Sequence, residues 1–196
     1  MKKLGKKGFT LIELLAVITI MGILLLVAIP AVSRTIENSR RDTFATTATE
    51  YLNAVRNAVL ADNIECGSGD TKAVASATAD GWYYFTVDTT ATGTKDLMES
   101  GGKSPFGNSE MKGYVLWHKT TANSGEANQK TTTKYWMTLV DSGKHGFVEW
   151  LSDSDIKRAK ISTSTNKSTS DIPAPAKSIT VGGTTIDTVP VACQLS

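Results

Sequence analysis

The sequence predicts an α+β protein in which one long N-terminal helix packs on an antiparallel β-sheet. Residues 9–32 are an almost uncharged apolar run, and apolar residues then recur at helical intervals as far as Val59. Beyond residue 80, short apolar or aromatic segments alternate with stretches rich in glycine, threonine and serine, which is typical of strands and turns. The length of 196 residues suits one globular domain with an appendage.

The first half of the predicted helix, residues 9–32, has the length of a membrane span. It would rise about 36 Å, enough to cross a hydrocarbon core of about 30 Å. Four lysines precede it, and the positive-inside rule places this end in the cytoplasm and the remaining chain outside. Glu13 lies within the run, where a charge costs free energy, so it is a candidate functional residue.

The second half of the predicted helix, residues 33–62, is amphipathic and must pack on another element. Pro30 removes a backbone donor and is expected, together with Gly22, to bend or soften the helix between the two halves. The apolar stripe that continues from the run consists of Val32, Ile36, Phe44, Ala48, Leu52, Val55 and Val59.

The remaining chain is predicted to form a loop at residues 63–80, a sheet at 81–151, and a polar linker with a terminal hairpin at 152–196. Polar connections are expected at 89–110 and 119–133, and a short helix or a continuing edge strand at Asp153–Ala159. The four predicted strands of the sheet are Trp82–Val87, Tyr114–His118, Tyr135–Val140 and Phe147–Leu151.

The segment Lys6-Lys7-Gly8-Phe9-Thr10-Leu11-Ile12-Glu13-Leu14-Leu15 closely resembles the processing motif of type IV pilins and pseudopilins. The resemblance covers residues 1 to about 35 and implies a pilin-like fold. It implies that a membrane peptidase removes a basic leader, residues 1–8, by cutting after Gly8, and that Phe9 becomes the N-methylated terminus. It also implies that Glu13 is needed for assembly, and Gly22 and Pro30 fall where the family has helix-weakening residues.

The resemblance also implies partners and a location. The partners would be a prepilin peptidase/methyltransferase, copies of this chain or other pilins in a helical filament, and an assembly platform membrane protein with its ATPase. The precursor would be a single-pass protein of the cytoplasmic membrane, in contact with lipid and with its head outside the cytoplasm. The mature chain would then join an extracellular or envelope-spanning filament.

The chemistry of Glu13 supports this interpretation independently. Cleavage after Gly8 would create an α-ammonium at the edge of the apolar run, which Glu13 could pair with in its own or a neighbouring subunit. A pair excluded from water is favourable only in the correct geometry, so Glu13 could set the register of the filament. The alternative is that Glu13 merely reaches the lipid headgroups.

The function therefore has a leading prediction and two alternatives. The leading one is a structural subunit of a type IV pilus-like filament. The first alternative is a pseudopilin of a type II secretion-like or DNA-uptake apparatus, and the second is an unprocessed, single-pass surface-anchored binding module. The chain is not expected to be an enzyme or to need a cofactor, because neither histidine has an evident nucleophile partner. Its small net charge gives no indication of nucleic-acid binding.

Two minor candidate sites remain. Cys66 and Cys193 could form a disulfide in an oxidising compartment, and free thiols or an intermolecular bond are the alternatives. Type IV pilins often carry a disulfide near the C-terminus, although its partner is usually closer in sequence than Cys66. Asp153 and Asp155 could supply calcium ligands, but no EF-hand-like spacing is present, so a solvated acidic turn is favoured and no metal is predicted.

Overall fold

The computed structural model describes residues 8–68, 72–75, 78–90, 97, 102–107, 109–163 and 169–196. The chain divides into two compact units, Met1–Ser39 and Arg40–Ser196, and helix α1 (Leu11–Leu60) contributes to both. Residues 1–7 of the predicted leader lie outside the described residues, as do parts of the predicted connections at 63–80 and 89–110.

In the first unit, α1 is an uninterrupted helix that contains both Gly22 and Pro30. Pro30 lacks an amide proton, which leaves one helical carbonyl without its usual donor. Val32 and Ile36 have the spacing of the predicted stripe but are exposed, because this unit contains nothing for them to pack on. Residues 33–39, which the sequence assigns to the head, accordingly group with the first unit.

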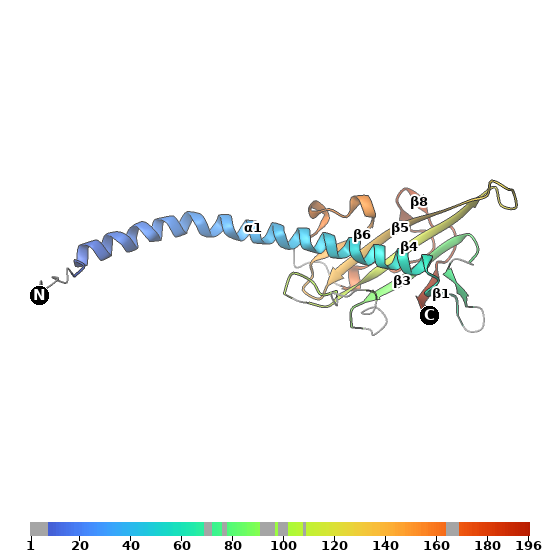
Figure 1. Ribbon diagram of the computed structural model, residues 1–196, viewed down its shortest axis with the longest axis horizontal. Helices are drawn as coiled ribbons and strands as arrows, with labels where there is room; N and C mark the ends of the chain where they lie inside the picture. The colour runs from blue at the N-terminus through green and yellow to red at the C-terminus, as the bar shows by residue number, and fades with distance from the viewer. Residues whose placement is uncertain are drawn as a thin grey trace, which may run out of the picture. The chain divides into compact units, whose positions relative to one another are not determined.

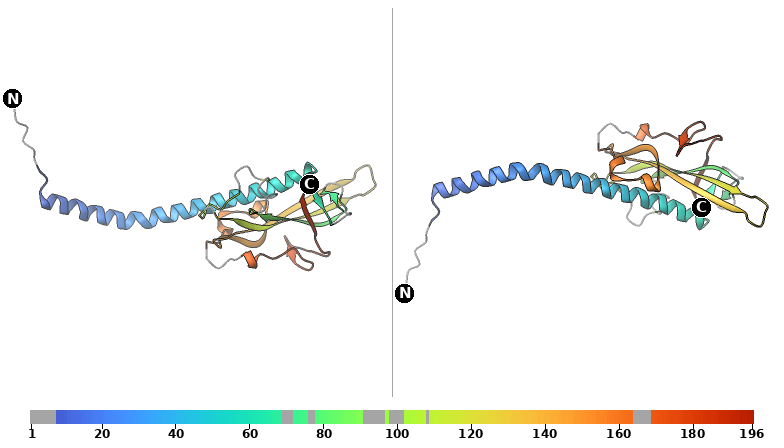
Figure 2. Two further views of the ribbon diagram at one scale, coloured as in Figure 1. Left: turned by 90° about the horizontal axis from the view of Figure 1, so that it is seen from below. Right: turned by 90° about the horizontal axis from the view of Figure 1, so that it is seen from above.

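In the second unit, α1 packs on one face of a sheet, as the two views of Figure 2 show. Apolar residues recur along α1 at intervals of three and four, which places one row of side chains against the sheet. The residues of α1 that this contact buries are Phe44, Ala45, Ala48, Tyr51, Leu52, Val55, Ala58 and Val59.

The described residues form a seven-stranded sheet with the order β2-β1-β9-β3-β4-β5-β6. Strands β3, β4, β5 and β6 are antiparallel neighbours and follow one another along the chain (Figure 1). The strands are β1 (Ile64–Cys66), β2 (Ala73–Val74), β3 (Gly81–Asp88), β4 (Met111–Ala122), β5 (Lys130–Asp141), β6 (Gly146–Ser152) and β9 (Val191–Leu195).

The α+β prediction of a long apolar helix packed on a sheet is confirmed, but the sheet is mixed rather than antiparallel. The difference comes from β9, the last strand, which lies between β1 and β3 and runs parallel to β3. This pairing joins segments that are far apart in the sequence, and such pairings leave little local signal.

Three predicted connections also contain regular structure. Residues 63–80 include β1 and β2, and most of residues 119–133 belong to β4 and β5, whose hairpin is longer than predicted. The segment after β6 forms two short 3₁₀ helices, η3 (Asp153–Asp155) and η4 (Arg158–Lys160), where one short helix or a continuing edge strand was predicted. These pieces are short or polar, so their periodicity is too weak to identify them.

The sheet is covered on both faces. Neighbouring residues of a strand point to opposite faces, so Tyr83 and Trp117 face α1 whereas Trp82 and Trp136 face away from it. The second face is covered by the C-terminal segment, which contains η5 (Thr169–Asp171) and the predicted small hairpin, formed by β7 (Thr180–Val181) and β8 (Thr184–Thr185) (Figure 2). The second unit, the head, therefore has a larger core between α1 and the sheet and a smaller one between the sheet and the C-terminal segment.

Candidate processing and assembly site

The Gly8–Phe9 peptide lies outside regular structure. Helix α1 begins two residues after Phe9, at Leu11, and the Phe9 side chain is 90% exposed. A Cβ built on Gly8 would meet no atom within 4 Å. Nothing in the described chain therefore requires a glycine at position 8, so a requirement for glycine would have to come from an enzyme that binds this peptide.

Thr10 and Glu13 cap the start of α1 reciprocally. The backbone nitrogen and the hydroxyl of Thr10 each donate to Oε2 of Glu13 at 2.8 Å, and the nitrogen of Glu13 donates to Oγ1 of Thr10 at 3.3 Å. The Thr10 carbonyl accepts the first helical hydrogen bond, from Leu14. This arrangement is a capping box, which satisfies donors that a helix start leaves unpaired.

The role of Thr10 was missed by the sequence reasoning, although the sequence carries the signal. A threonine followed three residues later by a glutamate, directly before an apolar run, is the capping-box pattern. Glu13 therefore has a partner in its own chain that does not depend on cleavage, unlike the α-ammonium of the filament interpretation.

The apolar side chains of the first unit are exposed around the whole circumference of α1. The helix is long and apolar enough to cross a membrane, judged by length and composition. Two of its hydroxyl groups are satisfied by the helix itself, since Thr19 donates to the carbonyls of Leu15 and Ala16 and Ser33 donates to that of Ile29. This surface suits lipid or other apolar helices.

Cys66 and Cys193 form a disulfide between β1 and β9. They are also register partners in the antiparallel pair formed by these strands. The bond lies in the second unit, among the residues that pack under α1. Its effect is to hold the last strand of the chain in the interior of the sheet.

The two calcium candidates each have a partner in the chain. Asp153 lies 3.6 Å from the guanidinium of Arg56, and Asp155 accepts a hydrogen bond from the hydroxyl of Ser152. Glu149 pairs with Lys160. Within the ranges that the structure describes, no group of three or more histidine, cysteine or acidic side chains is placed to hold a metal ion.

The two histidines occupy different environments. His145 contacts the buried carboxylate of Asp141 through Nδ1 at 3.0 Å, and the hydroxyl of Ser104 donates to the same carboxylate at 2.6 Å. Because this hydroxyl points at the carboxylate and not at the imidazole, the histidine does not activate it, and the cluster fastens the turn between β5 and β6. His118 stacks on Trp82 with 4.2 Å between ring centroids.

Comparison with known proteins agrees with this geometry. The family model described as the prokaryotic N-terminal methylation motif matches residues 3–29. The chain is 32% identical over 139 residues to the fimbrial protein EcpC of Eikenella corrodens, an alignment that spans 69% of this chain and 90% of that protein. No solved structure matches the chain. The methylation motif, the exposed apolar helix and the fimbrial relative together show that this chain belongs to the family of type IV pilins and pseudopilins.

Proposed function

We propose that the chain is a structural subunit of a type IV pilus-like filament, cleaved after Gly8, N-methylated at Phe9 and polymerised through residues 9–32. The observation that carries the proposal is the helix of the first unit, which exposes apolar side chains on every side. Soluble proteins rarely expose so large an apolar surface to water. The same surface serves two environments in turn, the lipid around the precursor and the neighbouring helices of the filament.

The accessible Gly8–Phe9 peptide supports processing at this bond. A protease needs an extended substrate segment, and residues 8–10, directly before the helix, are not helical. A peptidase/methyltransferase of the membrane is the partner that this step requires. Extraction of the processed chain and its stacking would need an assembly platform protein and its ATPase.

The capping box suggests how Glu13 reaches the filament without ever lacking a partner. In the precursor, its carboxylate accepts two hydrogen bonds from Thr10. Cleavage then adds the α-ammonium of Phe9, and assembly offers the ammonium of a neighbouring subunit. Exchanging one partner for another avoids an isolated buried charge, which would be costly. Correct stacking is thereby favoured over misaligned stacking.

The N-terminal mass of the chain purified from cells tests this function. N-methylated Phe9 is expected, whereas a terminus before Gly8 would favour the unprocessed anchored module. Electron microscopy of sheared surface material then separates pilus from pseudopilus. Long filaments that label with an antibody to this chain are expected, and their absence despite processing would favour the pseudopilin. The fimbrial name of the relative supports the pilus.

A further inference from the structure

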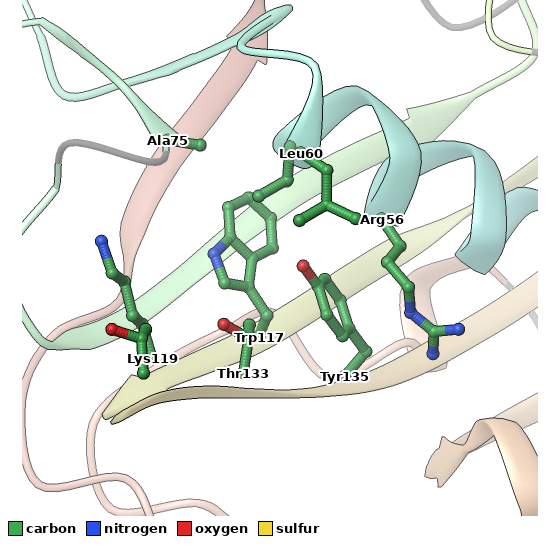
Figure 3. Close-up of a pocket in the computed structure, with 9 residues that line it drawn as sticks. Arg56, Leu60, Ala75, Trp117, Lys119, Thr133 and Tyr135 are labelled. Atoms are coloured by element: carbon green, nitrogen blue, oxygen red, sulfur yellow. The ribbon is translucent and has the colours of Figure 1, made fainter. Parts of the chain in front are cut away.

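A pocket of about 570 Å³ opens in the head, beside the last turns of α1 and over β4 and β5 (Figure 3). Its volume lies in the range of about 300–1,000 Å³ that small-molecule sites occupy. All of its wall belongs to the unit Arg40–Ser196. The lining residues are Arg56, Val59 and Leu60 of α1, Ala75, Trp117 and Lys119 of β4, and Thr131, Thr133 and Tyr135 of β5.

Two donors of this wall have no hydrogen-bond partner among the described residues, and they remain accessible although most of each side chain is buried. Trp117 is 1% exposed and Tyr135 is 9% exposed, yet neither the indole N–H nor the phenol hydroxyl is paired. Figure 3 shows Trp117 between Lys119 and Tyr135, with Leu60 above them. Because no other described side chain or backbone group occupies them, both donors are available to the acceptors of a ligand in the pocket.

The charges of the wall have one sign. Arg56 and Lys119 line the pocket and no carboxylate does. Arg56 is held in place by Asn53, to which it donates at 2.8 Å, by the Tyr135 ring, whose centroid lies 5.1 Å from its guanidinium carbon, and by Asp153, a carboxylate outside the pocket wall at 3.6 Å. Lys119 donates to the carbonyl of Thr78 at 2.7 Å. Two positioned cations beside two free donors favour an anionic acceptor such as a carboxylate.

The remaining wall is apolar and suits a compact ring. Val59, Leu60 and Ala75 supply aliphatic surface, and Trp117 and Tyr135 supply aromatic surface. We propose that this pocket binds a small organic anion in which a carboxylate is attached to a six-membered ring. Such a group could belong to a uronic acid of a polysaccharide or to an aromatic acid. The proposal is independent of how the filament assembles.

A titration of the full chain in detergent micelles tests the proposal. The probes are glucuronate and benzoate, each compared with a neutral counterpart, glucose or benzyl alcohol. The readout is the ¹H–¹⁵N signal of the Trp117 indole, one of four tryptophan indole signals expected from the sequence. We expect a saturable shift with at least one carboxylate and binding at least about tenfold weaker for its neutral counterpart. The carboxylate that binds more tightly shows whether the natural ligand is a uronic acid or an aromatic acid.

Matched variants inside and outside the pocket show whether the pocket is responsible. Leu60 is 74% exposed, so Leu60→Glu should fold normally while its added carboxylate repels the ligand. Leu60→Glu and Lys119→Gln should each weaken binding about tenfold. Asn57→Glu, on an exposed residue of α1 outside the pocket, and Lys130→Gln should leave it unchanged. Equal binding of neutral and charged probes, no saturable shift, or full binding by both pocket variants would overturn the proposal.

Discussion

Cys66 and Cys193 are joined by a disulfide and also face each other across the β1–β9 pair, with 4.0 Å between their Cα atoms. Cys193 is at the same time the register partner of Phe85 in β3. The bond therefore fixes β9 between two strands that lie far from it in sequence. It closes a loop that spans a sequence separation of 127 residues, which includes most of the head.

Replacing both cysteines by serine should destabilise the head strongly. In the chain-entropy model, a loop of this length accounts for about 4–5 kcal/mol of the free energy of unfolding. Guanidinium unfolding of the full chain in detergent, followed by tryptophan fluorescence, measures the change. The unsubstituted chain with a reducing agent should unfold at the same lower concentration as the variant. A loss below about 1 kcal/mol would show that β9 holds its place without the bond.

Two adjacent glycines allow the packing of the C-terminal hairpin to be measured. Gly182 and Gly183 have positive φ angles of 54° and 78°, so alanine is strained at either position. Only at Gly182 would the new Cβ collide, at 2.5 Å from Nε1 of Trp136, whereas at Gly183 it would meet nothing within 4 Å. Gly182→Ala should therefore cost about 1–3 kcal/mol more than Gly183→Ala in the same unfolding measurement. Equal costs would mean that the hairpin shifts freely over Trp136.

The pattern of correct and incorrect predictions follows from the range of the interactions. Phe44 and Leu52 could be assigned to the core because helical periodicity is local. Strands β3, β4, β5 and β6 could be predicted because each has its own alternation of apolar and polar residues. The position of β9 could not be predicted, since Val191–Leu195 has no local feature that selects a parallel partner. The exposure of Ile36 follows from its place in the first unit, which has no second element to pack on, and helical spacing does not encode this.

The functional residues also differ in whether the sequence could predict them. Gly8, Phe9 and Glu13 come from one short motif, and the capping by Thr10 could have been predicted from the same residues. The pocket could not, because the register of β4 and β5 and the packing of α1 together place Trp117, Tyr135 and Arg56 in one wall.

His118 should make the stability of the head depend on pH in mildly acidic solution. Burial lowers the pKa of His118 below its ordinary 6.5, with a smaller contribution from Lys134, while Asp187 and Asp80 act in the opposite direction. Because the folded pKa lies below the unfolded one, this stability is fully present above about pH 6.5 and is lost as the pH falls through the folded pKa. The midpoint of thermal unfolding should therefore decrease below about pH 6.5.

The His118→Phe variant provides the control for this pH dependence. Phenylalanine retains a ring that can stack on Trp82 but carries no titratable group. The decrease between about pH 6.5 and pH 5 should become smaller in the variant. The carboxylates of Asp80 and Asp88 have pKa values lowered from 3.8, so their stabilising effect is lost only at more acidic pH. An unchanged profile in the variant would assign the acid sensitivity to another group.

Substitutions of Glu13 and Thr10 separate the two roles that Glu13 can have. Glu13→Gln retains an oxygen that can accept the Thr10 hydrogen bonds, since glutamine also serves in capping boxes, but it removes the charge that an ammonium needs. Thr10→Val removes the capping hydroxyl and keeps the charge, at a cost of about 1 kcal/mol to the start of the helix. If Glu13 sets the register through an ion pair, Glu13→Gln and Glu13→Ala should each reduce filament yield at least about tenfold, while Thr10→Val should assemble nearly normally. Cleavage, measured by the mass of the N-terminus, should be normal in all three variants, and filaments are counted by electron microscopy of sheared material. Normal assembly of Glu13→Gln together with failure of Thr10→Val would instead mean that Glu13 acts by capping its own helix.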